Sequence, residues 1–412
     1  MATGPGDGHD DAVLDDAALD GLRQVGDEHA DKVAAEVRDR YPAVDENDVV
    51  RIVLRDLARG EQAGDETVRR WMFEGPDLPE WADVDKIRAG QAFFGDWPLA
   101  ITAALFCVSL PCAYAAADGT RVLGLTSDFA TKNASRRIAE TGQMLMDVMD
   151  LGRERPETLR PGGTGYATIR GVRLLHAVVR RTLMSDPAVW RSEQWGVPVN
   201  QEDLLGTLTT FTIAVFEGLD RLGIPYTPDE ADAYLHTWCV IGHLLGIRPA
   251  PARLPIGRAE AETLADTIAR RHHRPSEAGD RLMGVLLRQM EVSMPWGLRK
   301  LPRTLLHRLL PPEVVDVLPL PPPAWWHPGL TLVCRTFPVA ATLPGGRSLI
   351  RTIRTPSGLL GRSMIRLHVD RALAGEGPPF RVDPAVAARL SVGMSKPRRA
   401  LRTRRRRLRE KR

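Results

Sequence analysis

The chain has 412 residues, of which 43% are hydrophobic and 26% are charged, so it can bury a large core as one or two domains. Its net charge of +4 hides two opposite ends, because residues 1–50 carry 14 acids and 4 bases, whereas residues 396–412 carry 11 bases and one acid. This composition excludes a fibrous or wholly disordered chain and leaves a folded middle between two charged ends.

The four cysteines and the N-terminal residues indicate where in the cell the protein is expected. Cys107, Cys112, Cys239 and Cys334 show no CxxC spacing, which suits a reducing environment. The first 16 residues, MATGPGDGHDDAVLDD, are acidic and lack the apolar core of a signal peptide. We expect a cytoplasmic protein, with peripheral contact to a membrane left open.

The chain divides into five parts by composition and periodicity. Residues 1–12 are rich in Gly and Asp and are predicted to be disordered. Residues 13–80 are predicted to form an accessory helical layer, with amphipathic helices over 18–41 and 46–60. The core is expected over 81–325, further C-terminal helices and loops over 326–394, and a basic tail over 395–412. The plan is all-α, and the sequence shows no repeat.

An uncharged stretch opens the predicted core. Pro98–Ala117 has 20 residues without a charge, about the length that spans a bilayer. Alanines and hydroxyl side chains make it only weakly hydrophobic, so we predict a buried helix pair broken at Pro111. Asp118-Gly119 then indicates a turn, and RVLGLTSDF a short extended segment.

Helices are predicted over the rest of the core. They cover about 130–151 and 166–184, then 200–223 with Asn200 as N-cap and Gly223 as terminator. Thr227-Pro-Asp-Glu230 is a capping box that begins a helix ending near Gly246. Two more helices are expected within 256–294.

The helix predicted over Tyr166–Met184 carries a histidine within an apolar face. At 100° per residue, one stripe comprises Ile169, Val172, His176, Val179 and Leu183. A lone histidine on such a face is usually structural and hydrogen-bonds a backbone carbonyl. However, Arg173 and Arg180 lie along the edge of the stripe, and a guanidinium group at a buried face needs an anionic partner. A ligand that carries a metal and carboxylates would satisfy all three side chains.

A second polar pair lies on the helix predicted over 130–151. Arg137 and Thr141 are four residues apart, beside an apolar stripe that includes Met144 and Leu145. The ordinary alternatives are a threonine hydroxyl bonded to a carbonyl four residues back and a surface arginine. Together they give a modest indication of a pocket.

A rival metal site involves His236, Cys239 and His243, which share one helix face. Seven residues span about 10 Å along a helix, too far for both histidines to bind one ion at about 2 Å. Cys239 is more simply a small buried residue. His272-His273 lies in the charged run RRHHR and is predicted to be solvated surface.

The sequence lacks the motifs of several other classes of enzyme and binding protein. The sequence contains no GxxxxGK[ST], HExxH, GxSxG or Glu-x-x-His motif. The basic tail has no aromatic residue for base stacking, so specific nucleic-acid recognition is not expected. Its charge indicates either an electrostatic tether, which could contact an anionic membrane, or a solubility tail.

The motif Arg173-x-x-His176-x-x-x-Arg180, preceded by Arg137-x-x-x-Thr141, resembles the catalytic domain of the rubber oxygenases, or latex clearing proteins. That family also includes fungal membrane oxygenases that cleave a farnesyl side chain. The likeness covers about residues 81–322, including Tyr234-x-His236-x-Trp238 and the LLPPEVVDVLPLPP end.

The resemblance implies a globin-like all-α core with extra N- and C-terminal helices and a b-type haem. His176 would be the axial iron ligand, and Arg137 and Thr141 would line the pocket. Arg173 and Arg180 would support the ligand helix or pair with the haem propionates. The haem would be non-covalent, because CxxCH is absent. The implied partners are dioxygen and a hydrophobic small molecule, whose isoprenoid double bond is cleaved to carbonyl products.

Two features depart from the family members that degrade rubber. Those proteins are exported, whereas no export signal is expected here. They also use a glutamate ahead of the Arg-x-x-x-Thr pair, but residues 95–137 contain no Glu and, beyond Asp96, only Asp118 and Asp128 as acids. We therefore expect a haem-dependent oxygenase for an isoprenoid or lipid-like substrate other than rubber. The alternatives are a haem sensor or carrier without turnover, and a cofactor-free helical interaction protein.

Overall fold

The structure is a computed structural model that describes residues 14–41, 62–126, 131–150, 156–249, 254, 256–324 and seven isolated positions beyond 324. For 131–138 and 156–157 it describes the backbone alone. Within these ranges every regular element is a helix, apart from an isolated bridge between Ala116 and His273, which confirms the all-α prediction. The expectations for 1–12, 46–60, most of 326–394 and 395–412 lie outside the described residues.

The helices and helical turns of the described residues have the following bounds. In chain order they are α1 (Asp16–Leu22), α2 (Glu28–Arg40), α4 (Glu66–Phe73), α5 (Val84–Asp96), α6 (Pro98–Ala104), the π turn η2 (Leu105–Ser109), α7 (Leu110–Ala115), α8 (Ala117–Thr126), α9 (Thr131–Val148), the 3₁₀ turn η3 (Pro156–Leu159), α10 (Thr164–Met184), α11 (Ser192–Trp195), α12 (Gln201–Leu222), α13 (Pro228–Leu244), α14 (Arg258–His272), α15 (Glu277–Ser293), the 3₁₀ turn η4 (Trp296–Leu298), α16 (Leu301–Leu309) and α17 (Pro312–Val317).

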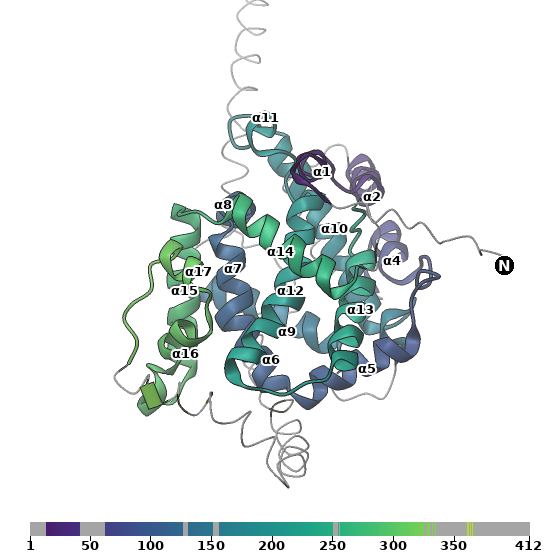
Figure 1. Cartoon of the computed structure of the whole chain (residues 1–412). Coiled ribbons are helices and arrows are strands. Elements are labelled where there is room, and N and C mark those ends of the chain that lie inside the picture. The colour runs from purple at the N-terminus through teal and green to yellow at the C-terminus, as the bar shows by residue number, and fades with distance from the viewer. Residues whose placement is uncertain are drawn as a thin grey trace, which may run out of the picture.

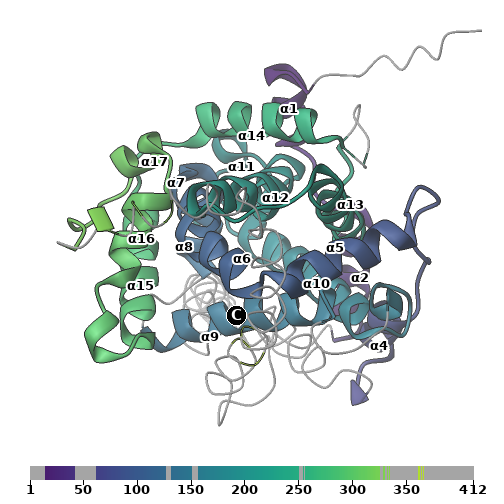
Figure 2. The ribbon, with the colours of Figure 1, turned by 60° about the horizontal axis from the view of Figure 1, so that its bottom comes forward.

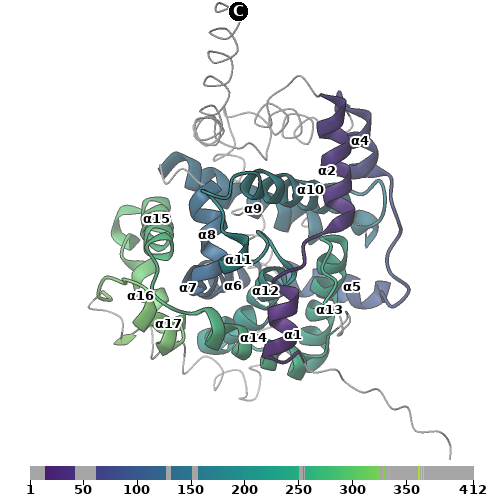
Figure 3. The ribbon, with the colours of Figure 1, turned by 90° about the horizontal axis from the view of Figure 1, so that it is seen from above.

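Helix α12 is the centre of the molecule (Figure 1). It packs against α6, η2, α13 and α14, and its buried residues join the main hydrophobic core. The helices α2 and α4 cover α10 on one side (Figure 3), where they form a second apolar cluster. The helices α15, α16 and α17 stack along the opposite flank (Figure 2) around a third cluster. The helix α10 is therefore enclosed between α2 and α4, which we call the N-terminal layer, and the core.

Local capping signals predicted the long helices correctly. Asn200 accepts a hydrogen bond from the backbone N–H of Asp203 at 2.8 Å, and Gly223 ends α12 with a φ of 76°. Thr227 and Glu230 form the predicted capping box at the start of α13. These signals act between neighbours in sequence, so they do not depend on the rest of the fold.

Pro111 does not break its helix, contrary to the prediction. The segment Pro98–Ala115 is continuous, because the wider turn η2 precedes the proline and the backbone N–H of Leu110 reaches the carbonyl of Leu105. A π turn widens the helix locally and accommodates the proline ring. By length and composition this segment suffices to cross a membrane, yet 56% of it is buried inside the protein, as in a core helix.

Two other local predictions were wrong. The helix expected over 18–41 is interrupted between Leu22 and Glu28, because the Asp27 carboxylate caps α2 by accepting from the N–H of Ala30 at 3.2 Å. Asp118-Gly119 and the segment RVLGLTSDF, expected to form a turn and an extended piece, lie largely within α8. There Val122 faces a small apolar cluster that favours the helix.

Close packing of α5 on α13 depends on Gly90. A Cβ atom at this position would lie within 3.0 Å of the Thr237 hydroxyl and of the backbone carbonyl of Ala233. Gly90→Ala should therefore destabilise the fold by about 1–3 kcal/mol, because α5 must move away from α13. Urea unfolding would measure this loss. Gly21→Ala is the control, since Gly21 is also helical and a Cβ there meets nothing within 4 Å; equal effects of the two changes would contradict the packing argument.

Candidate functional site

A large apolar cavity lies between helices of the core and the α15 flank. Its volume is about 1260 Å³, and its walls include Met144 and Leu145 of α9, Val172 and Val179 of α10, and Leu208 and Phe211 of α12. Ligand cavities usually measure about 300–1000 Å³. This one has room for a large apolar ligand or for two ligands side by side.

His176 lies on the wall of this cavity. Its Nδ1 atom is buried, and neither ring nitrogen has a hydrogen-bond partner among the described residues. A structural histidine would normally bond a carbonyl or a hydroxyl group. Here no such bond restrains the imidazole, so the ring remains available to a ligand.

The environment of His176 keeps the ring neutral. Burial, reinforced by the positive charge of Arg180, lowers the pKa of His176 to about 4. A neutral imidazole is the form that binds a metal ion. The ring is therefore in its metal-binding form at neutral pH.

The guanidinium group of Arg173 is bound by the N-terminal layer. It donates to both carboxylate oxygens of Asp27, from Nε at 2.5 Å and from Nη2 at 2.9 Å. Burial alone would raise the pKa of Asp27, but the hydrogen bonds and charge of Arg173 outweigh it and lower that pKa below its usual value. The two side chains form a buried bidentate ion pair between α2 and α10.

Arg180 is held in a similar way one turn beyond His176. Its Nη1 donates to Asp31 at 2.5 Å, its Nε to the carbonyl of Pro198 at 3.0 Å, and its Nη2 to the carbonyl of Val199 at 2.9 Å. The anionic partners that the sequence required for both arginines are therefore supplied by α2. Neither guanidinium group therefore needs an anionic ligand, and the contacts of both arginines hold α10 against the N-terminal helices.

Helix α9 contributes the second predicted pair. Thr141 lines the cavity, and Arg137 lies one turn earlier on the same helix, at a position whose side chain is outside the described residues. The adjacent Glu140 also lines the cavity and is largely buried. Sequence reasoning missed this carboxylate because it sought an acid only ahead of Arg137.

The rival histidines on α13 have ordinary structural roles. His236 accepts a hydrogen bond through Nε2 from the backbone N–H of Asp83 at 2.9 Å. Trp81 packs edge-on against both His236 and His243, and Cys239 is fully buried. No group of three metal-binding side chains occurs in the part of the chain that the structure describes. The two histidines of α13 thus pack against the loop that precedes α5.

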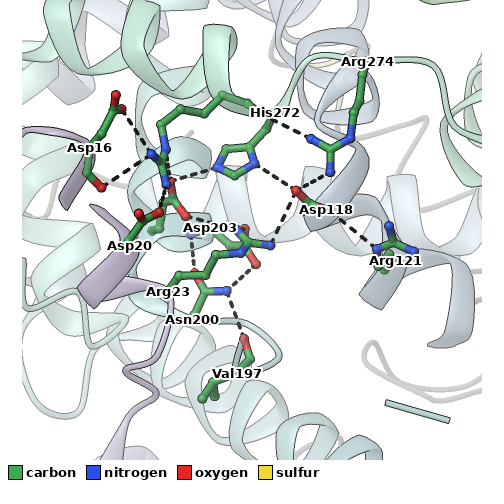
Figure 4. A network of polar contacts seen from close by, with 12 residues as sticks. Asp16, Asp20, Arg23, Asp118, Arg121, Val197, Asn200, Asp203, His272 and Arg274 are labelled. Atoms are coloured by element: carbon green, nitrogen blue, oxygen red, sulfur yellow. Dashed lines mark hydrogen bonds and ion pairs between the residues drawn. The ribbon is translucent and has the colours of Figure 1, made fainter. Parts of the chain in front are cut away.

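His272 is buried, contrary to the prediction of a solvated surface. Its Nδ1 lies 3.1 Å from Asp118 (Figure 4), and its Nε2 lies 2.8 Å from Glu202. Glu202 is fully buried and also accepts from Arg23 at 3.0 Å and from Arg271 at 2.8 Å. This network joins α1, α8, α12 and α14 at one edge of the cavity.

Charges within this network stabilise one another. Burial alone would lower the pKa of His272, but its hydrogen bonds to Asp118 and Glu202 raise it above the usual value. Burial likewise opposes ionisation of Glu202, yet His272 and the arginines lower its pKa to about 2. Glu202 is thus held as an anion by cations, which makes it a poor proton acceptor.

Fold and cavity together define an all-helical protein with an apolar ligand cavity and a neutral imidazole on its wall. Residues 91–341 match the family described as ER-bound oxygenase mpaB/B'/Rubber oxygenase, catalytic domain. The chain belongs to this family, which confirms the resemblance seen in the sequence.

Two relatives illustrate the similarity. The rubber oxygenase of Streptomyces sp. (strain K30) is 29% identical over 273 residues, which cover 64% of this chain and 63% of that protein. The chain thus matches less than two thirds of that relative. A structure of latex clearing protein LCP in the closed state superimposes with a TM-score of 0.62 over 88% of this chain and 94% of its own, at 22% identity, which shows a shared fold.

Asp27→Asn tests the ion pair that holds α10. Asparagine still caps a helix but leaves the buried charge of Arg173 uncompensated, so unfolding should become easier by about 3–5 kcal/mol. Asp85→Asn is the control, because the Asp85–Arg88 pair is exposed and should contribute little. Urea denaturation of both variants gives the comparison. Similar small losses would show that the Asp27 pair does not fix the helix.

The depressed pKa of His176 should appear in the pH dependence of folding. Between about pH 6.5 and 4 the unfolded chain binds a proton at this histidine that the folded chain does not, so the free energy of unfolding falls as pH falls. His176→Leu should remove about 2–3 kcal/mol of that decline. Urea unfolding is measured on the haem-free unmodified protein and on the haem-free His176→Leu variant between about pH 6.5 and 4. The difference between the two pH profiles gives the contribution of His176 alone, because the other histidines are present in both proteins. Parallel profiles would contradict a buried neutral imidazole.

Proposed function

We propose that the protein is a haem b-dependent oxygenase that cleaves or oxygenates a hydrophobic unsaturated substrate of the isoprenoid or lipid class. One observation carries the proposal: the neutral imidazole of His176, which has no hydrogen-bond partner among the described residues, lines an apolar cavity of about 1260 Å³. Membership of an oxygenase family supplies the reaction class. The unsaturated hydrocarbon class comes from the name of the Streptomyces relative, a rubber oxygenase.

The residues of the cavity fit a haem. His176 would hold the haem iron, and the aliphatic walls would pack against the macrocycle. Thr141 and Arg137 would contribute to the pocket from α9. Arg173 and Arg180 would act indirectly, because their guanidinium groups already bind Asp27 and Asp31. When bound, a haem supplies activation of dioxygen, which no amino-acid side chain provides.

The chain itself binds the substrate and excludes water. Each methylene group buried against apolar walls contributes about 0.8 kcal/mol, so a long hydrocarbon gains affinity without polar contacts. The cavity exceeds the usual size of a single-ligand site, which leaves space for a substrate beside a cofactor. Glu140 places a carboxylate on the wall that carries Thr141, where it would accept or hold a proton during turnover.

The axial role of His176 is tested by absorption spectroscopy. Protein loaded with haem should show a Soret band, and His176→Ala should lose most of it because the cavity then lacks its metal ligand. His243→Ala is the matched control, because this half-buried histidine on α13 does not line the cavity. Full haem content in the His176 variant would refute the assignment.

Oxygen uptake separates the enzyme from its alternatives. Isoprenoids of graded length, from farnesyl derivatives to squalene, should support uptake and yield carbonyl products in the haem-loaded protein. A haem sensor or carrier would bind haem and show no turnover. A protein that stays colourless after haem addition would instead be a cofactor-free helical protein.

A further inference from the structure

The turn between α15 and α16 exposes an unusual group of apolar side chains. Among the described residues eight large hydrophobic side chains are exposed, and three of them lie within residues 292–298. Val292 is 69% exposed, Trp296 87% and Leu298 49%. Single exposed apolar residues are common, but a cluster that includes a tryptophan marks an interaction surface.

Two cations adjoin this cluster. Arg299 and Lys300 follow Leu298 directly, and both are exposed. The nearest acid in the sequence, Glu291, forms an ion pair with Arg303, so its charge is offset. Exposed indole and aliphatic groups beside lysine and arginine are the combination that binds the interface of an anionic membrane.

The same stretch forms part of the cavity wall. Met290, Ser293 and Met294 line the cavity from the end of α15, and Leu301 and Leu305 line it from α16. These helices lie together on one flank of the molecule (Figure 2). The exposed apolar cluster is therefore continuous in sequence with residues that face the cavity.

We infer that residues 292–300, the α15–α16 turn, dock on an anionic lipid bilayer. A stable protein interface needs about 800 Å² from each partner, which three side chains on one turn do not supply. Shallow insertion of a tryptophan and a leucine, with cations at the headgroups, needs only this small area. The docking rests on the exposed residues alone; entry of a hydrophobic substrate from the bilayer to the adjoining cavity rests on the proposed function.

Vesicle binding of the full-length protein tests the docking. The probes are phosphatidylcholine vesicles with and without phosphatidylglycerol, and binding is measured by co-sedimentation. Two double variants, Trp296→Ser with Leu298→Ser and Arg299→Glu with Lys300→Glu, should each weaken binding to the anionic vesicles at least about tenfold.

Matched controls distinguish the turn from general surface chemistry. Val25→Ser removes an apolar side chain that is 47% exposed elsewhere, and Lys86→Glu with Arg88→Glu reverses two exposed charges on α5. Both controls should bind vesicles as the unmodified protein does. Equal weakening by the controls would overturn the assignment of this turn.

Bromine-labelled lipids report insertion of the indole itself. Trp296→Phe should retain binding but lose the quenching of tryptophan fluorescence by the lipid bromine. Binding that persists unchanged in both double variants, or an absence of binding to anionic vesicles, would overturn the inference. The Soret band is recorded on the same samples: intact haem without vesicle binding refutes only the docking, and vesicle binding without haem refutes only the proposed function.

Discussion

Two ion pairs, one buried and one half-buried, join α10 to α2 and its N-cap and set the orientation of the cavity histidine. Arg173 precedes His176 by one turn and binds Asp27, while Arg180 follows it by one turn and binds Asp31. Because Arg173 and Arg180 are seven residues apart, they point to nearly the same side of α10. A rotation of α10 about its axis would break both ion pairs and leave the buried guanidinium groups unpaired. The N-terminal helices thus orient the imidazole of His176 through the two arginines.

Features that depend on near neighbours could be predicted from the sequence. The structure has the apolar stripe of α10, the Asn200 cap and the Thr227 capping box, all of which arise from residues within a single helix or next to it. The inward position of His176 also followed from the stripe, but the cavity that its ring lines did not. Family resemblance then connected that histidine to a class of chemistry, which periodicity alone does not provide.

Features that depend on distant partners could not be predicted in this way. The partners of Arg173 and Arg180 lie 146 and 149 residues away, in an acidic region that looks like solvated surface. His272 shows the same difficulty: its neighbours in sequence are charged, yet Asp118 and Glu202 enclose it from other helices. Charged side chains are compatible with both solvent and buried networks, so composition does not decide between them.

The π turn η2 has a consequence for how the helix Pro98–Ala115 tolerates insertions and deletions. The π turn holds one residue more than the α-turn it replaces, while the helix beyond it continues. Loss of a single residue between Leu105 and Ser109 would therefore restore an α-turn and leave the faces of α7 in place, so that Leu110 and Tyr114 still line the cavity. Loss of a residue from α7 between those two side chains would instead rotate Tyr114 by about 100°. The wide turn is thus the part of this helix that can change in length without moving the cavity wall.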